Sequence, residues 1–170
     1  MRKKKSEQIT EYLIALAEKG NYKSPGKEWQ ERRFSDQGYA FWLNANPVRF
    51  YPGYGLPKEV SDIDKGRFIT CMHWLECDTG MIYHKVNGVN KPLPMNQLAK
   101  RLEISERQCY RFIRRMCDLR IMTKEERRLY VNPVYAFRGK YLSYHLYKLF
   151  KPELDKVLPE WVVTRYEAMI

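Results

Sequence analysis

Residues 98–122, LAKRLEISERQCYRFIRRMCDLRIM, constrain the fold of this chain more than any other segment. The segment opens with the apolar spacing of a short helix, at Leu98, Ala99 and Leu102. Ile104 then falls in a tight turn, where an apolar side chain can lock two helices together. Ser105 fits the N-cap of a second, longer helix, because its hydroxyl can accept from a free amide of the next turn. This order of short helix, turn and long helix predicts a helix-turn-helix.

The predicted second helix has two unlike sides. One side is apolar and runs through Cys109, Phe112, Ile113, Met116 and Ile121. The other side is basic, and its first turn and a half corresponds to the part of a recognition helix that reaches base edges. Because Arg pairs with guanine and Gln with adenine, the predicted base-reading residues are Arg107, Gln108 and Arg111. The predicted contacts of this motif with the DNA backbone are Lys100, Ser105, Tyr110, Arg114 and Arg115.

The charge of the chain favours DNA binding over an ordinary solvated helix face. Residues 98–128 hold ten Lys/Arg against five Asp/Glu, a net charge of +5, within a chain of net charge +11. A basic protein of this kind is expected to have a polyanionic partner. We expect double-stranded DNA and no membrane, because no apolar run approaches the roughly 20 residues that a membrane-spanning helix needs.

A hairpin is predicted after the second helix. Residues 122–133, MTKEERRLYVNP, have the pattern of two short strands around a charged turn. If the hairpin is a wing, it brings three further cations to the DNA backbone, Lys124, Arg127 and Arg128. The alternative is a plain surface hairpin, in which these side chains have no partner.

Upstream, residues 61–76 have the pattern of a scaffold helix. Ser61 fits its N-cap, Asp64 stands in a capping-box-like position, and Phe68, Met72 and Leu75 share one face. Residues 78–94 contain Gly and Pro and are expected to form a loop or a short extended excursion. The predicted fold class is therefore mainly α with a small β-hairpin wing (α+β), a winged helix-turn-helix with helical extensions at both ends.

The chain divides into three predicted parts. Residues 1–50 comprise a basic arm, an amphipathic helix and a connector, residues 51–135 the winged helix-turn-helix domain, and residues 136–170 an aromatic-rich helical tail. Short strands are expected in 39–44 and 48–55, as a hairpin that leads into the core. A helix is expected over 141–150, and its apolar face either packs on the core or forms a homodimer interface. The structure of the last ten residues stays open.

Three segments resemble the plasmid and phage replication proteins of the RepL type, relatives of the MarR-like winged-helix regulators. They are GLPKEVSDIDKGRFITCMHW at 55–74, LAKRLEISERQCYRFIRRM at 98–116 and RLYVNPVYAFRGKYLS at 128–143. The first two are typical of the fold, and only VNPVYAFRG points towards replication proteins. The resemblance implies a winged helix that binds origin or operator DNA without enzymatic activity. The chain departs from the family at Glu103 and Leu119, where many such proteins have glycine.

No residue pattern predicts catalysis or a cofactor. The sequence has no Gly-rich phosphate loop, no His-Glu-x-x-His motif and no nucleophile elbow. The cysteines show no CxxC spacing, and on a helix Cys71, His73 and Cys77 do not share one face. We therefore expect no enzyme activity, no metal and no cofactor. Since no secretory signal is recognisable, we also expect reduced thiols and a cytoplasmic protein.

Three functional classes stay open at this stage. The first is a replication initiator or accessory factor of a mobile element, which would recruit host replication proteins. The second is a transcriptional regulator, a class in which homodimers are common because duplex sites are often two-fold symmetric. The third is a protein-interaction module built on a winged helix, such as a polymerase-binding factor, and it predicts weak, sequence-indifferent DNA binding.

Overall fold

A computed structural model describes residues 34–35, 38–40, 48–50 and 55–169. The predicted basic arm and amphipathic helix, within residues 2–17, lie outside the described residues. Among the residues that the structure describes, no helix is long and apolar enough to cross a membrane.

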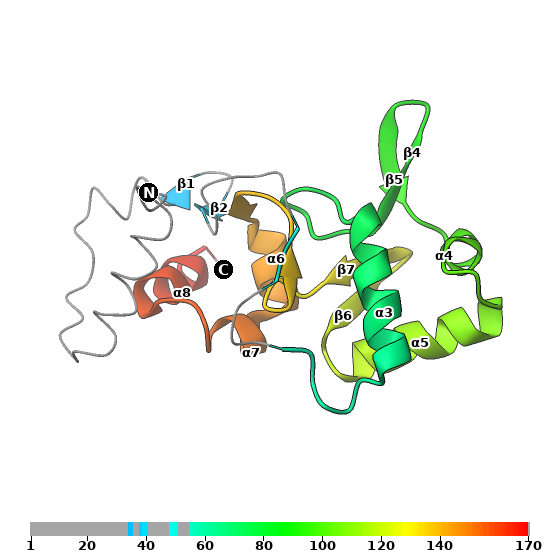
Figure 1. Ribbon diagram of the computed structural model, residues 1–170. Coiled ribbons are helices and arrows are strands. Elements are labelled where there is room, and N and C mark those ends of the chain that lie inside the picture. Colours follow the sequence, from blue (N-terminus) through cyan, green and yellow to red (C-terminus); the bar gives the residue numbers. More distant parts are fainter. Residues whose placement is uncertain (1–33, 36–37, 41–47, 51–54, 170) are drawn as a thin grey trace, which may run out of the picture.

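The described chain is a mixture of helices and small antiparallel sheets, as the predicted α+β class requires (Figure 1). Its helices are α3 (Asp62–Cys71) with the 3₁₀ turn η1 (Met72–Trp74), α4 (Met95–Arg101), α5 (Glu106–Asp118), α6 (Tyr144–Leu149), α7 (Lys151–Leu154) and α8 (Glu160–Glu167). Its strands are β1 (Phe34–Ser35), β2 (Gly38–Ala40), β3 (Arg49–Phe50), β4 (Tyr83–Val86), β5 (Val89–Pro92), β6 (Met122–Glu125), β7 (Arg128–Val131), β8 (Ala136–Phe137) and β9 (Tyr141–Leu142).

The expected scaffold helix corresponds to α3 and η1. Ser61 caps α3, because its hydroxyl accepts a hydrogen bond from the Asp64 amide at 3.2 Å. The carboxylate of Asp64 does not complete a capping box as its position suggested. It is buried and accepts instead from Arg67 on the same helix and from Arg115 on α5. Asp64 therefore connects two helices.

The predicted short helix is α4, the predicted turn is formed by residues 102–105, and the predicted long helix is α5. Helix α4 begins at Met95, three residues before the expected segment. Glu103 adopts φ 55°, the left-handed backbone that glycine often supplies at such a turn. Ser105 and Gln108 form a capping box at the start of α5. The predicted apolar side of α5 is buried at Cys109, Phe112, Ile113 and Met116. Ile121, which was expected on the same side of this helix, is also buried but follows the end of α5 at Asp118.

Helix α5 ends at Asp118, and the left-handed residue that follows it stands one position later than the departure at Leu119 suggested. Leu119 keeps φ −85°, and the left-handed conformation falls on Arg120 at φ 57°. The side chain of Arg120 is held by Glu153 on α7, with Nε 3.1 Å from Oε1. A contact with the C-terminal tail thus holds a residue whose left-handed backbone conformation is uncommon for residues other than glycine and asparagine.

The hairpin predicted in 122–133 is formed by β6 and β7. Its register joins Glu125 to Arg128 around a two-residue turn, in which Glu126 has φ 54°. Residues 80–82 pair with the other edge of β7, where the amide of Ile82 donates to Leu129 at 2.8 Å and the amide of Val131 donates to Gly80 at 2.8 Å. Strand β7 is therefore central between β6 and this segment.

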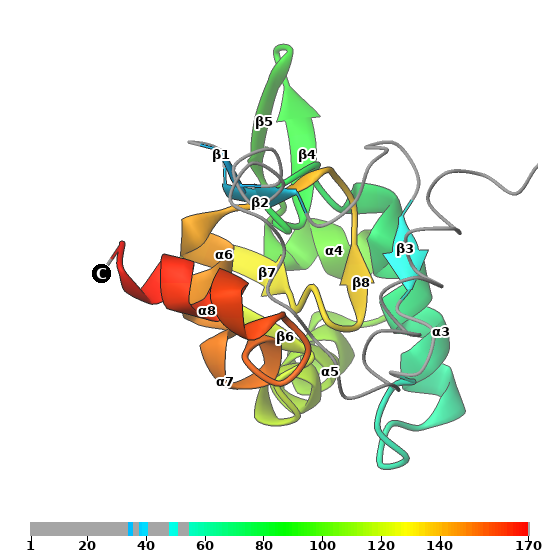
Figure 2. The ribbon, with the colours of Figure 1, turned by 90° about the vertical axis from the view of Figure 1, so that its left-hand side faces the viewer.

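A second hairpin occupies most of the region that was expected to be loop or an extended excursion. Strands β4 and β5 pair from Tyr83 with Pro92 to Val86 with Val89, around Asn87 and Gly88 at φ 52° and 80°. Asn-Gly is the preferred pair for such a turn, because both of its residues tolerate positive φ. Figures 1 and 2 show this hairpin projecting from the body, on the side away from α5.

The predicted hairpin between 39–44 and 48–55 is wrong. Strand β2 pairs with β1 and with β9, and β3 pairs with β8, so both predicted strands join C-terminal partners (Figure 2). Part of the expected connector, Phe34–Ser35, is strand β1. The sequence pattern identified extended segments but carried no information about partners about 100 residues away, because strand pairing depends on the whole fold.

The predicted helix over 141–150 is shorter in the structure. Tyr141–Leu142 is strand β9, and α6 begins after Ser143, whose hydroxyl accepts from the Leu146 amide at 3.3 Å. The expected apolar face is buried within the chain, at Leu142, Leu146 and Phe150, which is the core alternative for this face. The last segment, which the sequence left open, forms α8.

Two apolar cores meet at β7. One core lies under α3, α4, α5 and β6, and the other lies among α6, α7 and α8. Leu129 and Val131 belong to the first core, whereas Tyr130 between them belongs to the second. Side chains alternate between the two faces of a strand, so β7 joins the helix-turn-helix to the C-terminal tail.

Candidate nucleic-acid interface

The exposed side of α5 presents a row of arginines. Successive residues of a helix are turned by about 100°, which places Arg107, Arg111 and Arg114 within about 60° of one another. All three are exposed, and the buried stripe of α5 occupies the opposite side. Packing of that stripe against the core therefore orients the arginine row outwards, as the sequence predicted for this side of the helix.

Acids limit the positive charge of this row at both ends. Glu106 is in the first turn, and Asp118 in the last turn lies 4.0 Å from the Nε of Arg114. Both side chains of this pair are exposed, at 85% and 69%, so the pair is weak and Arg114 can exchange Asp118 for another anion. Arg107 and Arg111 make no ion pair with a described residue.

Gln108, one of the three predicted base readers, already has a structural role. Its Oε1 accepts from the Ser105 amide at 3.0 Å and lies 3.1 Å from the Ser105 hydroxyl. Bidentate recognition of adenine needs both the oxygen and the nitrogen of a Gln side chain. While the capping box is intact, Gln108 therefore offers only its amide N–H groups, and Ser105 contributes its hydroxyl to the cap.

The predicted backbone contacts are not equally placed. Lys100 on α4 is exposed, and Tyr110 on α5 is 52% exposed. Arg115 differs from both, because its guanidinium is bound to the buried carboxylate of Asp64, with Nη2 2.6 Å from Oδ2. Its side chain is still 50% exposed.

The predicted cations of the β6–β7 hairpin, Lys124, Arg127 and Arg128, are all exposed. The hydroxyl of Tyr130 raises the pKa of the Arg128 guanidinium, which stays positively charged at every physiological pH. The turn end of the hairpin is tied to the tail, because the carboxylate of Glu125, the last residue of β6, lies 3.0 Å from the Nε2 of His145 on α6. The tail thus contacts the hairpin beside the turn, where Arg127 and Arg128 are exposed.

Sequence reasoning missed the side chains of the β4–β5 hairpin. Lys85 and Lys91 are exposed there, and the signal that could have located them is the Asn-Gly pair between two short runs of strand-forming residues. It also missed Arg67, which no spacing within the helix-turn-helix could reveal. Arg101, next to the predicted Lys100, lies over the ring of Trp74 at 5.1 Å and so packs against the molecule.

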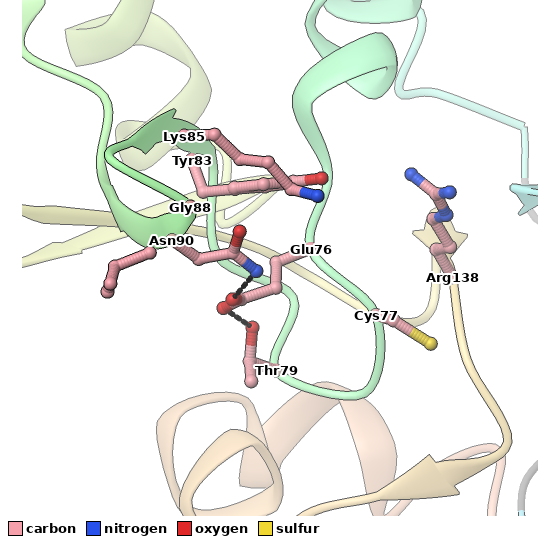
Figure 3. A pocket seen from close by; sticks show the side chains of 9 residues that line it. Glu76, Cys77, Thr79, Tyr83, Lys85, Gly88, Asn90 and Arg138 are labelled. Carbon is pink, nitrogen blue, oxygen red and sulfur yellow. Dashed lines mark hydrogen bonds between the residues drawn. The ribbon is translucent and has the colours of Figure 1, made fainter.

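A polar cleft of about 560 Å³ opens beside the β4–β5 hairpin (Figure 3). Its lining residues are Glu76, Cys77, Thr79, Tyr83, Lys85, Gly88, Val89, Asn90 and Arg138. The carboxylate of Glu76 accepts from the Thr79 hydroxyl at 2.6 Å and from the Asn90 amide at 2.7 Å, which fastens the hairpin to the preceding loop. Figure 3 shows Tyr83 and Lys85 reaching over the cleft from β4, with Arg138 on its other side.

The cysteines do not gather into a site. Burial raises the pKa of the Cys71 thiol to about 12 and that of Cys109 to about 11, so both stay protonated at neutral pH. Cys71 is buried whereas Cys77 is exposed. Within the described ranges, no group of three or more His, Cys, Asp or Glu side chains is arranged to hold a metal ion.

No protein-family model, no curated protein and no solved structure matches this chain. Its function has to be inferred from its own residues.

Proposed function

We propose that this chain is a sequence-specific double-stranded DNA-binding protein, built on a winged helix-turn-helix with α5 as the recognition helix. The single observation that carries the proposal is the two-sided character of α5. Its apolar side is buried, and Arg107, Arg111 and Arg114 project from the opposite side. An arginine row on an outward-facing helix of this length suits the major groove, which admits one α-helix.

The order of the elements supports the proposal. The scaffold helix of such a domain corresponds to α3, and its first strand to residues 80–82. The helix-turn-helix follows as α4 and α5, and the wing as β6 and β7. The pairing of residues 80–82 with β7, and of β7 with β6, provides its small antiparallel sheet. In this assignment the β6–β7 turn is the wing, and the β4–β5 hairpin is an insertion before the helix-turn-helix.

The proposed contacts follow from exposure. Arg107 and Arg111 read base edges from the first half of α5, and Gln108 assists with its amide N–H groups. The DNA backbone is contacted by Lys100, Tyr110, Arg114, Arg115, Lys124, Arg127 and Arg128. Phosphate contacts set position and affinity, whereas base contacts set specificity, so the two groups are separable by experiment.

The role in replication of a mobile element rests on the resemblance carried by VNPVYAFRG. In this structure the segment is a junction, since Asn132 is fully buried and its side chain bonds Arg120 and Val134. These contacts give Asn132 a structural role, so its presence in the segment does not require a direct contact with DNA. We therefore propose a plasmid or phage replication initiator or accessory factor on the resemblance, with a transcriptional regulator as the alternative.

The test is selection of binding sites from random and from neighbouring genomic duplex DNA at about 150 mM salt, where unspecific electrostatic binding is partly suppressed. We expect one enriched motif for the wild-type chain and loss of preference at one or more positions for Arg107→Ala. Lys148→Ala, which removes an exposed cation from α6, is the matched control and should select the wild-type motif. A motif within an origin supports the replication role, and a motif within a promoter supports the regulator.

Absence of any motif, together with binding that disappears as salt rises, would contradict sequence-specific recognition. That result would favour the third class, a protein-interaction module.

A further inference from the structure

A buried carboxylate lies directly behind the proposed DNA-binding side of α5. The side chain of Asp64 is only 4% exposed. Its Oδ2 accepts a hydrogen bond from Nε of Arg115 at 2.8 Å and lies 2.6 Å from Nη2 of the same guanidinium in an ion pair, and its Oδ1 accepts from Nη1 of Arg67 at 3.0 Å. Both carboxylate oxygens are thus occupied by arginines, one from α3 and one from α5, 51 residues away along the chain from Asp64.

The contact with Asp64 holds the side chain of Arg115 but does not use all of its hydrogen-bond donors. A guanidinium has five N–H donors, and the hydrogen bond to Asp64 uses only the Nε–H of Arg115. The side chain remains 50% exposed, so the other donors can face solvent. Along α5, Arg115 is turned by about 40° from Arg111, which places it at the margin of the arginine row.

Fixing an arginine in advance favours binding of an anion. A free arginine side chain loses rotamer freedom when it binds, whereas one that is already ordered by a hydrogen bond and an ion pair loses little. The planar guanidinium also presents its remaining donors in a geometry that matches phosphate. Arg67 contributes by occupying Oδ1, which leaves Oδ2 to Arg115.

We propose that Arg115, positioned by Asp64 and Arg67, forms a preorganised binding site for one backbone phosphate of DNA. This inference rests on the proposed function and assigns Asp64 as a positioning residue that touches no DNA. It has an unusual consequence. Removing the negative charge of Asp64 should weaken DNA binding, although removal of an acid beside DNA ordinarily strengthens it by relieving repulsion of phosphate.

The test compares Asp64→Asn with Asp62→Asn, by fluorescence anisotropy on a short duplex of arbitrary sequence over a range of salt concentrations. Asp62 is a matched control because it lies on the same helix, is 96% exposed and, among the described residues, pairs with Lys65 alone. We expect Asp64→Asn to bind about threefold to tenfold more weakly than wild type, the loss typical of one disordered side chain at an interface. Asp62→Asn should bind as tightly as wild type or more tightly.

A double-mutant cycle shows whether Asp64 acts through Arg115. In the Arg115→Ala background, Asp64→Asn should no longer weaken binding. Wild-type affinity or tighter binding of the folded Asp64→Asn variant would overturn the proposal while leaving DNA binding itself intact. Failure of the wild-type chain to bind duplex DNA at low salt would overturn this proposal and the proposed function together.

Circular dichroism establishes whether Asp64→Asn folds. If it does not fold, Arg115→Lys tests the same proposal, because this variant keeps the charge but replaces the planar guanidinium with a single ammonium group. Weakened binding by Arg115→Lys supports the positioned guanidinium, and wild-type affinity overturns it.

Discussion

The side-chain amide of Asn132 donates a hydrogen bond to the backbone carbonyl of Arg120 at 2.8 Å. It thereby joins the residue that follows β7 to the second residue after α5, across the open end of the β6–β7 hairpin. The Oδ1 of the same side chain accepts from the Val134 amide at 3.0 Å. One buried side chain thus satisfies two backbone groups and sets the position of the hairpin relative to α5.

Replacement of Asn132 by alanine should therefore be costly. The change leaves the backbone carbonyl of half-buried Arg120 and the buried amide of Val134 without these partners, and an unsatisfied buried group costs about 1–3 kcal/mol. We expect the free energy of unfolding to fall by about 2–4 kcal/mol, measured by urea denaturation. A decrease of less than about 0.5 kcal/mol, the usual range for surface positions, would contradict this role.

Gly139→Ala and Gly66→Ala should have opposite effects on stability. Gly139 has φ 135°, and a Cβ there would lie 2.5 Å from the backbone nitrogen of Asp78. Gly66 lies within α3, and a Cβ there would meet nothing within 4 Å. In thermal denaturation we expect a lower melting temperature for Gly139→Ala and a gain of up to about 1 kcal/mol for Gly66→Ala. Destabilisation by both variants would contradict the open space at Gly66.

Arg111→Ala and Arg128→Ala should separate specificity from general affinity. If Arg111 reads a guanine, its loss should lower the preference for the true site over random DNA by about 1–3 kcal/mol. Arg128→Ala should weaken binding to all sequences alike and reduce the slope of log affinity against log salt by about 0.9. Equal losses on specific and random DNA for both variants would contradict this division of roles.

Gln108→Glu separates the capping role of this residue from its DNA-binding role. Glutamate serves in a capping box as well as glutamine does, so the melting temperature should stay close to that of the wild type. The new carboxylate would repel phosphate and cannot donate to adenine, so DNA affinity should fall. Gln108→Ala, in contrast, should lower stability by up to about 1 kcal/mol, because it removes the bond from the Ser105 amide to the Gln108 side chain and leaves only the bond from the backbone amide of residue 108 to the Ser105 hydroxyl. Unchanged DNA affinity in Gln108→Glu would place this side chain outside the interface.

The buried thiol of Cys71 should make stability fall at alkaline pH. Burial raises the pKa of Cys71 from 9.0 to about 12, so the folded chain keeps this proton where the unfolded chain releases it. The contribution of Cys71 to stability is complete below pH 9 and is lost as pH rises towards 12. Denaturation between pH 8 and 11 should show a shallower decline for Cys71→Ala than for wild type. Parallel declines would contradict the assignment.

Local patterns in the sequence predicted α3, α4 and α5 well. The caps at Ser61 and Ser105, and the buried stripe of α5, depend on residues within one or two turns of each other, so spacing alone reveals them. The β6–β7 hairpin was recognisable for the same reason. The β4–β5 hairpin was missed although its Asn-Gly turn is also a local signal.

Pairings between distant segments could not be predicted in this way. The sequence alone indicated extended segments near β2 and β3 but joined them to each other, whereas the structure pairs them with β9 and β8. Nothing local distinguishes these partners, because backbone hydrogen bonds are the same for every strand and the choice depends on which faces become buried.

The sequence by itself therefore determined which side of α5 is apolar, where that helix begins and that its outer side is basic, since each follows from helical geometry and capping. Only the tertiary structure decided the environments of the individual arginines. It attached Arg115 to Asp64, held Arg120 against Glu153 and left Arg107 and Arg111 exposed. The physical reason is that an arginine becomes positioned or stays available according to the charges that folding brings beside it, and those charges lie tens of residues away along the chain.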